Sequence, residues 1–315
     1  MRAVRSSDGS VTVADVELGH GDGVRVKVTT AGICGSDLSI VAGGMVPFTL
    51  GHEIAGVLDD GTRVAIEPLA PCGTCDQCGK GAYNRCRSSS LLFGVGRDGG
   101  MADYVLAPER TLVPLPDRAP AGAGCLVEPI AVSLHGVRQA RTVASDRVLV
   151  IGGGTIGLTA VAAAKSVGAT VDLVARHPHQ AAAGQSLGAR VGEPDGEYDV
   201  VIDCAGNEAT ITQAVETCAP GGTIVVLAAH HRTMPVNGLA VMLKEVSLIG
   251  SLCYGWSPPG TKQARDFESA AALLAEEPAI ATTLITHRFP LDRAVDAFAA
   301  AADRKSGSIK VVLEP

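Results

Sequence analysis

The sequence predicts an α/β protein in which a doubly wound parallel sheet is joined to an irregular antiparallel β domain. Three observations carry this prediction. Short β-like runs punctuated by Gly and Pro fill the chain up to around residue 115, strands alternate with helices from Arg147 onward, and a glycine-rich turn separates the first of those strands from its helix. Alternating strands and helices are typical of a parallel sheet covered by helices.

Composition and charge narrow the function classes. The chain has 315 residues, 46% of them hydrophobic and 19% charged, which suits a large core. Its net charge of −7 argues against binding to nucleic acid or an anionic membrane surface, since both need an excess of Lys and Arg. The longest apolar segment, residues 148–167, is interrupted by glycines and a lysine, so we expect no membrane span. Nine cysteines without a recognisable secretory signal predict reduced thiols and a cytoplasmic protein.

Elements of the first domain are predicted from β-prone runs bounded by Gly and Pro. These runs are Val11–Val13, Gly23–Thr29, Glu53–Leu58 and Arg63–Ile66. A cluster of prolines follows, and the apolar segment Glu128–Ala140 is expected to form a helix.

Elements of the second domain are predicted from strands that alternate with helices. The strands are expected at Arg147–Ile151, Thr170–Ala175, Asp199–Asp203 and Thr223–Leu227, with one helix at Thr155–Val167 ended by Gly168 and another ended by Pro220-Gly221-Gly222. In the tail we expect a helix near Arg265–Ala275, a strand near Thr283–Ile285, a helix near Leu291–Ala301 and a strand at Ile309–Leu313. This tail is expected to return to the first domain, which would comprise residues 1–129 and 266–315 around a second domain at 130–265.

A glycine-rich turn points to a dinucleotide. The segment Gly152–Gly157 fits G-x-G-x-x-G, follows a predicted strand and opens a predicted helix. Gly152 permits the tight turn, Gly154 lets a pyrophosphate approach the backbone, and Gly157 lets helix and sheet pack closely. Thr155 and Ile156 begin the helix, whose free N–H groups would bind the pyrophosphate. The alternative is a plain strand–turn–helix without a ligand.

The end of the second strand bears on the choice of cofactor. Asp172 has the chemistry to hold the adenosine ribose but lies in the middle of the strand, whereas the tip reads Ala175-Arg176-His177, with His179 nearby. A small residue followed by a guanidinium and imidazoles suits a 2′-phosphate, which favours NADP over NAD. In the alternative, Arg176 is solvated and Asp172 reaches the ribose.

Two groups of residues suggest metal sites. Cys72, Cys75, Cys78 and Cys86 have the spacing of a closed tetrahedral zinc site; a pair of disulfides or a nucleic-acid module is the alternative. Cys34, His52 and Glu128 could form a three-ligand site with an open fourth position. In the alternative, His52 is a hydrogen-bonded core histidine and Glu128 a helix-start acid.

Taken together, these segments resemble the zinc-dependent medium-chain dehydrogenases/reductases, and most of all the polyol branch that includes sorbitol dehydrogenase and threonine dehydrogenase. The motifs that carry the resemblance follow the family's order over nearly the whole chain: Ala31–Asp37, Gly51–Glu53 with Gly56, Pro71–Cys78, Asp98–Tyr104, Val127–Pro129, Gly152–Gly157 and Asp199–Asp203.

This resemblance implies a chaperonin-10-like β-barrel catalytic domain with a four-cysteine zinc lobe, a Rossmann dinucleotide-binding domain, and a cleft between them. It implies two zinc ions per chain, one structural and one catalytic, the latter on Cys34, His52 and Glu128. NADP is the preferred cofactor, with NAD as the alternative.

The resemblance also assigns roles around the catalytic zinc. Glu53 would be an alternate or outer ligand, and Asp37 would orient His52 through its other ring nitrogen. Ser36 would take the substrate proton, and Lys310 would meet the cofactor or Glu53. Where family members often carry a histidine three residues after the proton-accepting hydroxyl, this chain has Ser39, so the proton must leave by another path.

The predicted activity is hydride transfer between a small-molecule secondary alcohol, such as a polyol, cyclitol or amino alcohol, or its ketone, and NAD(P). The resemblance favours a homodimer or homotetramer joined around Val246–Leu252, and the acidic net charge argues against nucleic-acid or membrane partners. A catalytically silent dinucleotide-binding protein of the same fold is the alternative, and the complete set of open-site ligands argues against it.

Overall fold

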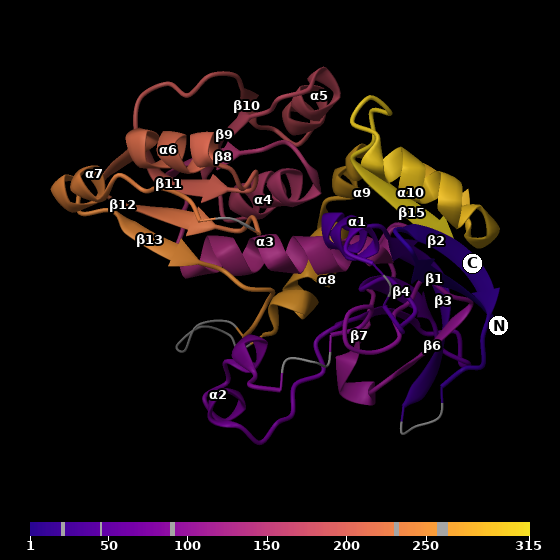
Figure 1. The fold of residues 1–315 in the computed structure, drawn as a ribbon. Coiled ribbons are helices and arrows are strands. Elements are labelled where there is room, and N and C mark those ends of the chain that lie inside the picture. The colour runs from indigo at the N-terminus through magenta and orange to yellow at the C-terminus, as the bar shows by residue number, and fades with distance from the viewer. Residues whose placement is uncertain (20–22, 45, 89–91, 230–232, 257–263) are drawn as a thin grey trace. The chain divides into compact units, whose positions relative to one another are not determined.

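The computed structural model describes residues 1–19, 23–44, 46–88, 92–229, 233–256 and 264–315 (Figure 1). By its internal contacts the chain divides into two compact units. The first contains Met1–Glu128 and Phe267–Pro315, and the second contains Pro129–Asp266. The chain therefore enters the second unit once and leaves it once.

The first unit is built on a mainly antiparallel sheet with the strand order β14-β15-β3-β4-β5-β7, in which β6 also pairs with β3. A separate hairpin is formed by β1 and β2. The strands are β1 Arg2–Ser7, β2 Ser10–Asp15, β3 Val24–Gly32, β4 Glu53–Val57, β5 Arg63–Ile66, β6 Tyr104–Ala107, β7 Leu112–Pro114, β14 Ile285–Pro290 and β15 Lys310–Glu314.

Aliphatic side chains fill the core of this unit, because aromatic residues make up only 3% of the chain. Val26 and Val28 alternate with exposed residues along β3, as expected for a strand with one face on the core. The helices of the unit are α1 Gly35–Ala42, α2 Asp76–Gly79, α8 Asp266–Glu276, α9 Ala279–Leu284 and α10 Ala294–Ala302.

The second unit is a six-stranded parallel sheet with the order β10-β9-β8-β11-β12-β13. Its strands are β8 Arg147–Ile151, β9 Thr170–Val174, β10 Arg190–Val191, β11 Tyr198–Asp203, β12 Cys218–Val226 and β13 Ser247–Gly250. Its helices are α3 Val127–Gln139, α4 Thr155–Ser166, α5 Pro178–Ser186, α6 Glu208–Thr217 and α7 Gly238–Leu243. The strand order reverses between β8 and β11, and such a switch point is where open α/β sheets bind ligands.

Two predicted elements are wrong in detail. Thr283–Ile285 was expected as a strand because of its β-branched residues, but α9 runs to Leu284 and β14 begins at Ile285. The burial of Ile280 and Leu284 on one helical face outweighs that local preference. The segment Pro220-Gly221-Gly222 does not end the preceding helix, because α6 stops at Thr217 and β12 already includes these residues beside a shift in strand register.

Within the described part of the chain, every helix is too short or too polar to cross a bilayer. None of the nine cysteines, which all lie among the described residues, forms a disulfide.

Candidate metal and dinucleotide sites

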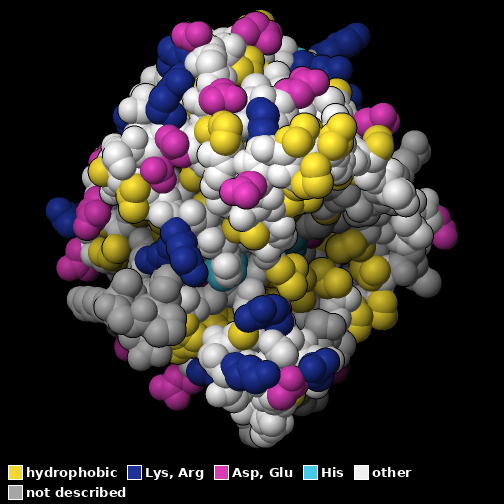
Figure 2. Space-filling model, turned by 90° about the vertical axis from the view of Figure 1, so that its left-hand side faces the viewer, with side chains coloured by type: hydrophobic (Ala, Val, Ile, Leu, Met, Phe, Trp, Pro, Cys, Tyr) yellow, Lys and Arg dark blue, Asp and Glu magenta, His cyan; other side chains and the backbone are white. Residues whose placement is uncertain are grey.

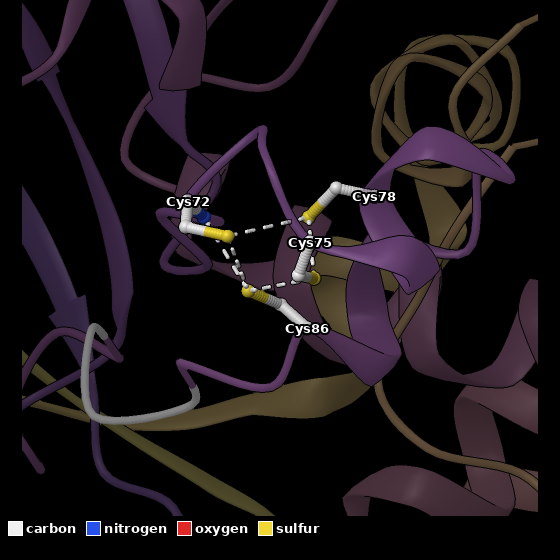
Figure 3. A group of neighbouring side chains, drawn as sticks. All are labelled: Cys72, Cys75, Cys78 and Cys86. Carbon is white, nitrogen blue, oxygen red and sulfur yellow. Dashed lines mark hydrogen bonds between the residues drawn. The ribbon is translucent and has the colours of Figure 1, made fainter.

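Four cysteine sulfurs of the first unit face one another (Figure 3). The Sγ–Sγ distances are 3.5 Å for Cys72–Cys86 and Cys75–Cys78, and 4.0 Å for Cys72–Cys78 and Cys75–Cys86. A zinc ion with Zn–S bonds of about 2.3 Å would separate its sulfurs by about 3.8 Å in a regular tetrahedron. The cluster therefore has the size and donor chemistry of a closed zinc site.

The backbone around this cluster favours a thiolate at Cys72, whereas burial raises the pKa of Cys78 to about 12. The N–H groups of Thr74 and Cys75 lower the pKa of Cys72 to about 5, so that this sulfur is ionised at neutral pH. The backbone N–H groups of Cys72 and Ser88 each donate to Cys86 Sγ at 3.4 Å.

A buried contact not foreseen from the sequence attaches the cysteine lobe to the sheet. The Tyr83 hydroxyl, three residues before Cys86, donates to Glu67 Oε1 at 2.5 Å, and both residues are buried. Glu67 follows β5 directly, so this contact ties the lobe to the strand that precedes it. The two residues are 16 positions apart, too far for a local pattern to connect them.

A second cluster forms where β3 and β4 pair. The register sets Gly32 opposite Glu53, which brings Cys34, just after β3, close to His52 and Glu53 at the start of β4. One ligand atom from each of the three residues lies within 4.8 Å of the others. A Cβ at Gly32 would lie 1.9 Å from Glu53 Oε2, so only glycine leaves room for this carboxylate.

Asp37 and Ser36, both on α1, complete the surroundings of His52. Asp37 Oδ2 accepts from the Cys34 backbone N–H at 2.9 Å, and Asp37 Oδ1 lies 3.6 Å from His52 Nδ1. Ser36 Oγ lies 3.5 Å from His52 Nε2. The structure thus places Asp37 and Ser36 at opposite ring nitrogens.

The second cluster fits a cation. Glu53 Oε2 is buried without a hydrogen-bond partner, a costly state unless a further group binds there, whereas His52 Nδ1 and Asp37 Oδ1 face each other at 3.6 Å. Burial lowers the pKa of His52, but Asp37 and Cys34 outweigh burial and hold it well above the usual value. The site therefore attracts positive charge, and its sulfur, imidazole and carboxylate donors suit zinc.

Glu128 lies in the first turn of α3 and is 7% exposed. Burial raises its pKa to about 7, and the charges of His52 and Glu53 both act on it. It is not among the three residues whose ligand atoms lie within 4.8 Å of one another. The structure thus brings Cys34, His52 and Glu53 together and sets Glu128 in their electrostatic field.

Lys310, the first residue of β15, lies fully buried beside Glu53. Its Nζ donates to Glu53 Oε1 at 2.7 Å and to the Ile33 carbonyl at 2.9 Å. The two side chains are 2% and 1% exposed. Of the two partners expected for Lys310, the structure shows Glu53; contact with a cofactor stays a prediction.

The glycine turn of the second unit has the expected geometry. Gly152 has φ +112°, a conformation that favours glycine, and Gly154 is the N-cap of α4. A Cβ at Gly157 would lie 1.7 Å from the Gly152 carbonyl oxygen, so this position too requires glycine. Thr155 and Ile156 lie in the first turn of α4, and the N-terminus of a helix is where backbone N–H groups can bind an anion.

Residues at β9 separate into a buried and an exposed group. Asp172 is 5% exposed and accepts from Arg190 Nε at 3.0 Å and from the Tyr198 hydroxyl at 2.5 Å. Arg176 is exposed beyond the strand end, and the rings of His177 and His179 stack at 5.5 Å. The carboxylate of Asp172 is therefore engaged within the sheet, whereas the cationic side chains lie beyond its end.

Comparisons with known proteins cover most of the chain. Residues 20–117 match the family model of the alcohol dehydrogenase GroES-like domain, and residues 155–276 match that of the zinc-binding dehydrogenases. The galactitol 1-phosphate 5-dehydrogenase of Escherichia coli (strain K12) is 32% identical over 90% of this chain and 91% of its own. The sorbitol dehydrogenase of Bacillus subtilis (strain 168) is 28% identical, over 95% and 92%. A zinc-binding dehydrogenase of Sinorhizobium meliloti 1021, solved bound to NADP, superimposes with a TM-score of 0.89 at 31% identity, covering 100% and 99%.

Proposed function

The chain belongs to the polyol branch of the zinc-dependent medium-chain dehydrogenases. We propose that it oxidises a polyol-like secondary alcohol with NADP at the cluster of Cys34 and His52. The meeting of Cys34, His52 and Glu53, with Glu128 in their electrostatic field, carries this proposal. The first unit would be the catalytic domain and the second the dinucleotide-binding domain.

Cys34, His52 and Glu128 would hold the catalytic zinc. Glu53 would be the alternate ligand, because one of its oxygens is fixed by Lys310 and the other has no partner. Cys72, Cys75, Cys78 and Cys86 would hold a second, structural zinc. Zinc held by these residues would supply a Lewis acid that lowers the pKa of a substrate hydroxyl, and a bound nicotinamide would supply the hydride acceptor.

Residues of α1 would handle the proton. Ser36 is exposed and next to His52, so it can accept the substrate proton and pass it to water. Asp37 orients the imidazole of His52 from the other side. Ser39 replaces the expected outer histidine, and its hydroxyl donates to the Gly35 carbonyl at 3.1 Å. We therefore propose that the proton leaves from Ser36 directly to solvent.

A preference for NADP is supported at the end of β9. Asp172 is occupied by Arg190 and Tyr198, whereas Arg176 is exposed and free to meet a 2′-phosphate. Replacing Arg176→Ala should lower kcat/KM with NADP by about tenfold and leave kcat/KM with NAD unchanged, because it removes a charge-assisted contact. A wild-type protein that prefers NAD would overturn this part of the proposal.

The substrate is expected to resemble those of the relatives, which act on galactitol 1-phosphate and sorbitol. A panel of polyols, polyol phosphates and matching ketones, assayed by nicotinamide absorbance, tests this directly.

Assembly into a homodimer or homotetramer is supported by an exposed apolar edge on the second unit. Leu239, Met242 and Leu243 of α7 are 63%, 63% and 70% exposed, and Leu248 lies on β13, the edge strand of the sheet. Figure 2 shows hydrophobic side chains on the side where Figure 1 places these elements. Analytical sedimentation of the wild type and of Leu243→Glu tests this assembly, and a monomeric wild type would refute it.

The described cysteines form no disulfide, which supports a reducing compartment, and we take this compartment to be the cytoplasm.

The central test compares metal content with turnover. Wild type should hold about two zinc ions per chain. Cys34→Ala should hold one, lose turnover and still bind NADPH, whereas Cys218→Ala, which removes a buried thiol of the other unit, should behave as wild type. A wild type with a single zinc would favour the catalytically silent alternative, and turnover by zinc-depleted Cys34→Ala would refute the proposed mechanism.

A further inference from the structure

Two hydroxyl groups are buried between α3 and α4, which lie side by side (Figure 1). Ser133 of α3 and Thr159 of α4 are both 0% exposed, and their hydroxyl oxygens are 2.7 Å apart. Around Thr159, α4 buries small or aliphatic side chains, whose packing is not directional. This hydroxyl pair is thus a directional contact in an otherwise apolar stretch of the helix.

Both hydroxyls lie close to backbone carbonyl groups at the start of α3 and of α4. Thr159 Oγ1 lies 3.2 Å from the Pro129 carbonyl oxygen and 3.0 Å from those of Thr155 and Ile156. Ser133 Oγ lies 3.2 Å from the Ile156 carbonyl oxygen. Each hydroxyl can donate one proton. One of the two protons makes the bond between the hydroxyls, and the other is donated to a carbonyl oxygen, whichever hydroxyl plays which part.

The two ends of this contact belong to different parts of the proposed machinery. Pro129 follows Glu128 directly, so its carbonyl belongs to the turn that carries the proposed zinc ligand. Thr155 and Ile156 form the first turn of the helix that begins at the glycine turn. The hydroxyl pair therefore connects the backbone next to Glu128 with the helix start proposed to bind the pyrophosphate.

We propose that Ser133 and Thr159 are positioning residues that fix the first turn of α3, and with it Glu128, in register with the dinucleotide-binding helix. This inference rests on the proposed role of Glu128 as a zinc ligand. Zinc–carboxylate bonds fall within a narrow range of about 2.0–2.2 Å, whereas apolar contacts between helices are not directional. A directional contact at this point would help to hold the ligand within that range.

The test replaces Thr159→Val, which keeps the shape and removes the hydroxyl. We expect one of the two zinc ions to be lost to a chelator about tenfold faster than in wild type, the scale of one hydrogen bond. The other zinc should remain, the dissociation constant for NADPH should not change, and kcat should fall with KM for NADP constant. Thr159→Ser should restore zinc retention and kcat, because it returns the hydroxyl.

Two controls separate positioning from stability. Thr217→Val removes the hydroxyl of another helical threonine, which donates to the Gln213 carbonyl at 2.8 Å in α6 of the second unit; its zinc retention should match wild type. The pair Ser133→Ala with Thr159→Val leaves no unsatisfied hydroxyl, so it should recover the unfolding temperature but not zinc retention.

Either of two results would overturn the inference: Thr159→Val that keeps both zinc ions as firmly as wild type, or zinc retention that returns in the double variant together with stability. Failure of the proposed function itself looks different, since wild type would then hold a single zinc or show no turnover.

Discussion

Removing the amine of Lys310 should destabilise the first unit strongly. Lys310→Met keeps most of the side-chain volume, but it leaves Glu53 buried without the cation 2.7 Å away and the Ile33 carbonyl without its donor. Both members of the ion pair are almost inaccessible to water, so solvent cannot replace the lost partner. Breaking such a buried pair by removing one member costs about 3–5 kcal/mol.

That loss is large compared with the total stability of a domain, about 5–15 kcal/mol. Urea unfolding followed by circular dichroism, at fixed zinc concentration, measures it. Combining Lys310→Met with Glu53→Gln removes both charges, and this double variant should regain most of the lost free energy of unfolding. If Lys310→Met unfolds within about 1 kcal/mol of wild type, or if the double variant is no more stable than the single one, the buried pair does not stabilise the unit as argued.

Three further predictions concern other parts of the molecule. In zinc-free protein, Glu128 has its pKa raised from 4.5 to about 7, so the stability gained from its protonation is complete below pH 4.5 and is lost as the pH rises through 7, a change of about 3 kcal/mol. Glu128→Gln should remove this pH dependence, which is measured as the difference in the free energy of unfolding in urea between pH 5 and pH 8. An equal difference in wild type and variant would contradict the prediction. Gly157→Ala forces a Cβ against the Gly152 carbonyl, so stability should fall by about 1–3 kcal/mol and fluorescence titration should show weaker NADPH binding; unchanged binding would argue against the turn as the dinucleotide site. Tyr198→Phe removes a donor to Asp172 and should cost about 1–3 kcal/mol in urea unfolding, whereas a neutral result would mean that Arg190 alone satisfies the carboxylate.

The sequence predicted best what local patterns determine. The limits of β5 and β8 agree with the predicted strands, because apolar runs ended by turn residues carry that information within a few positions. The end of α9, Thr283 and Leu284, was predicted as part of a strand, because the burial of Ile280 and Leu284 is not visible in a short window of β-branched residues.

The sites follow the same rule. The four cysteines lie within 15 positions, so their spacing alone indicated a shared metal site. Cys34 and His52 meet only because β3 and β4 pair, and their association was predicted through family resemblance rather than through spacing. The hydrogen bonds of Thr159 to Pro129 and of Tyr83 to Glu67 depend on how helices and loops pack in three dimensions. No local sequence pattern therefore predicts them.

The place of β15 in the sheet has a consequence for synthesis on the ribosome. Lys310 follows Glu53 by 257 positions, and the whole of Pro129–Asp266 is translated in between. At a translation rate of about 5–20 residues per second, Lys310 is added roughly 13–50 s after Glu53. Throughout that interval the edge of β3 that later receives β15 is open to incorrect pairing. The inserted unit can meanwhile finish folding, so Glu53 gains its buried counter-ion only after the last strand of the chain has been made.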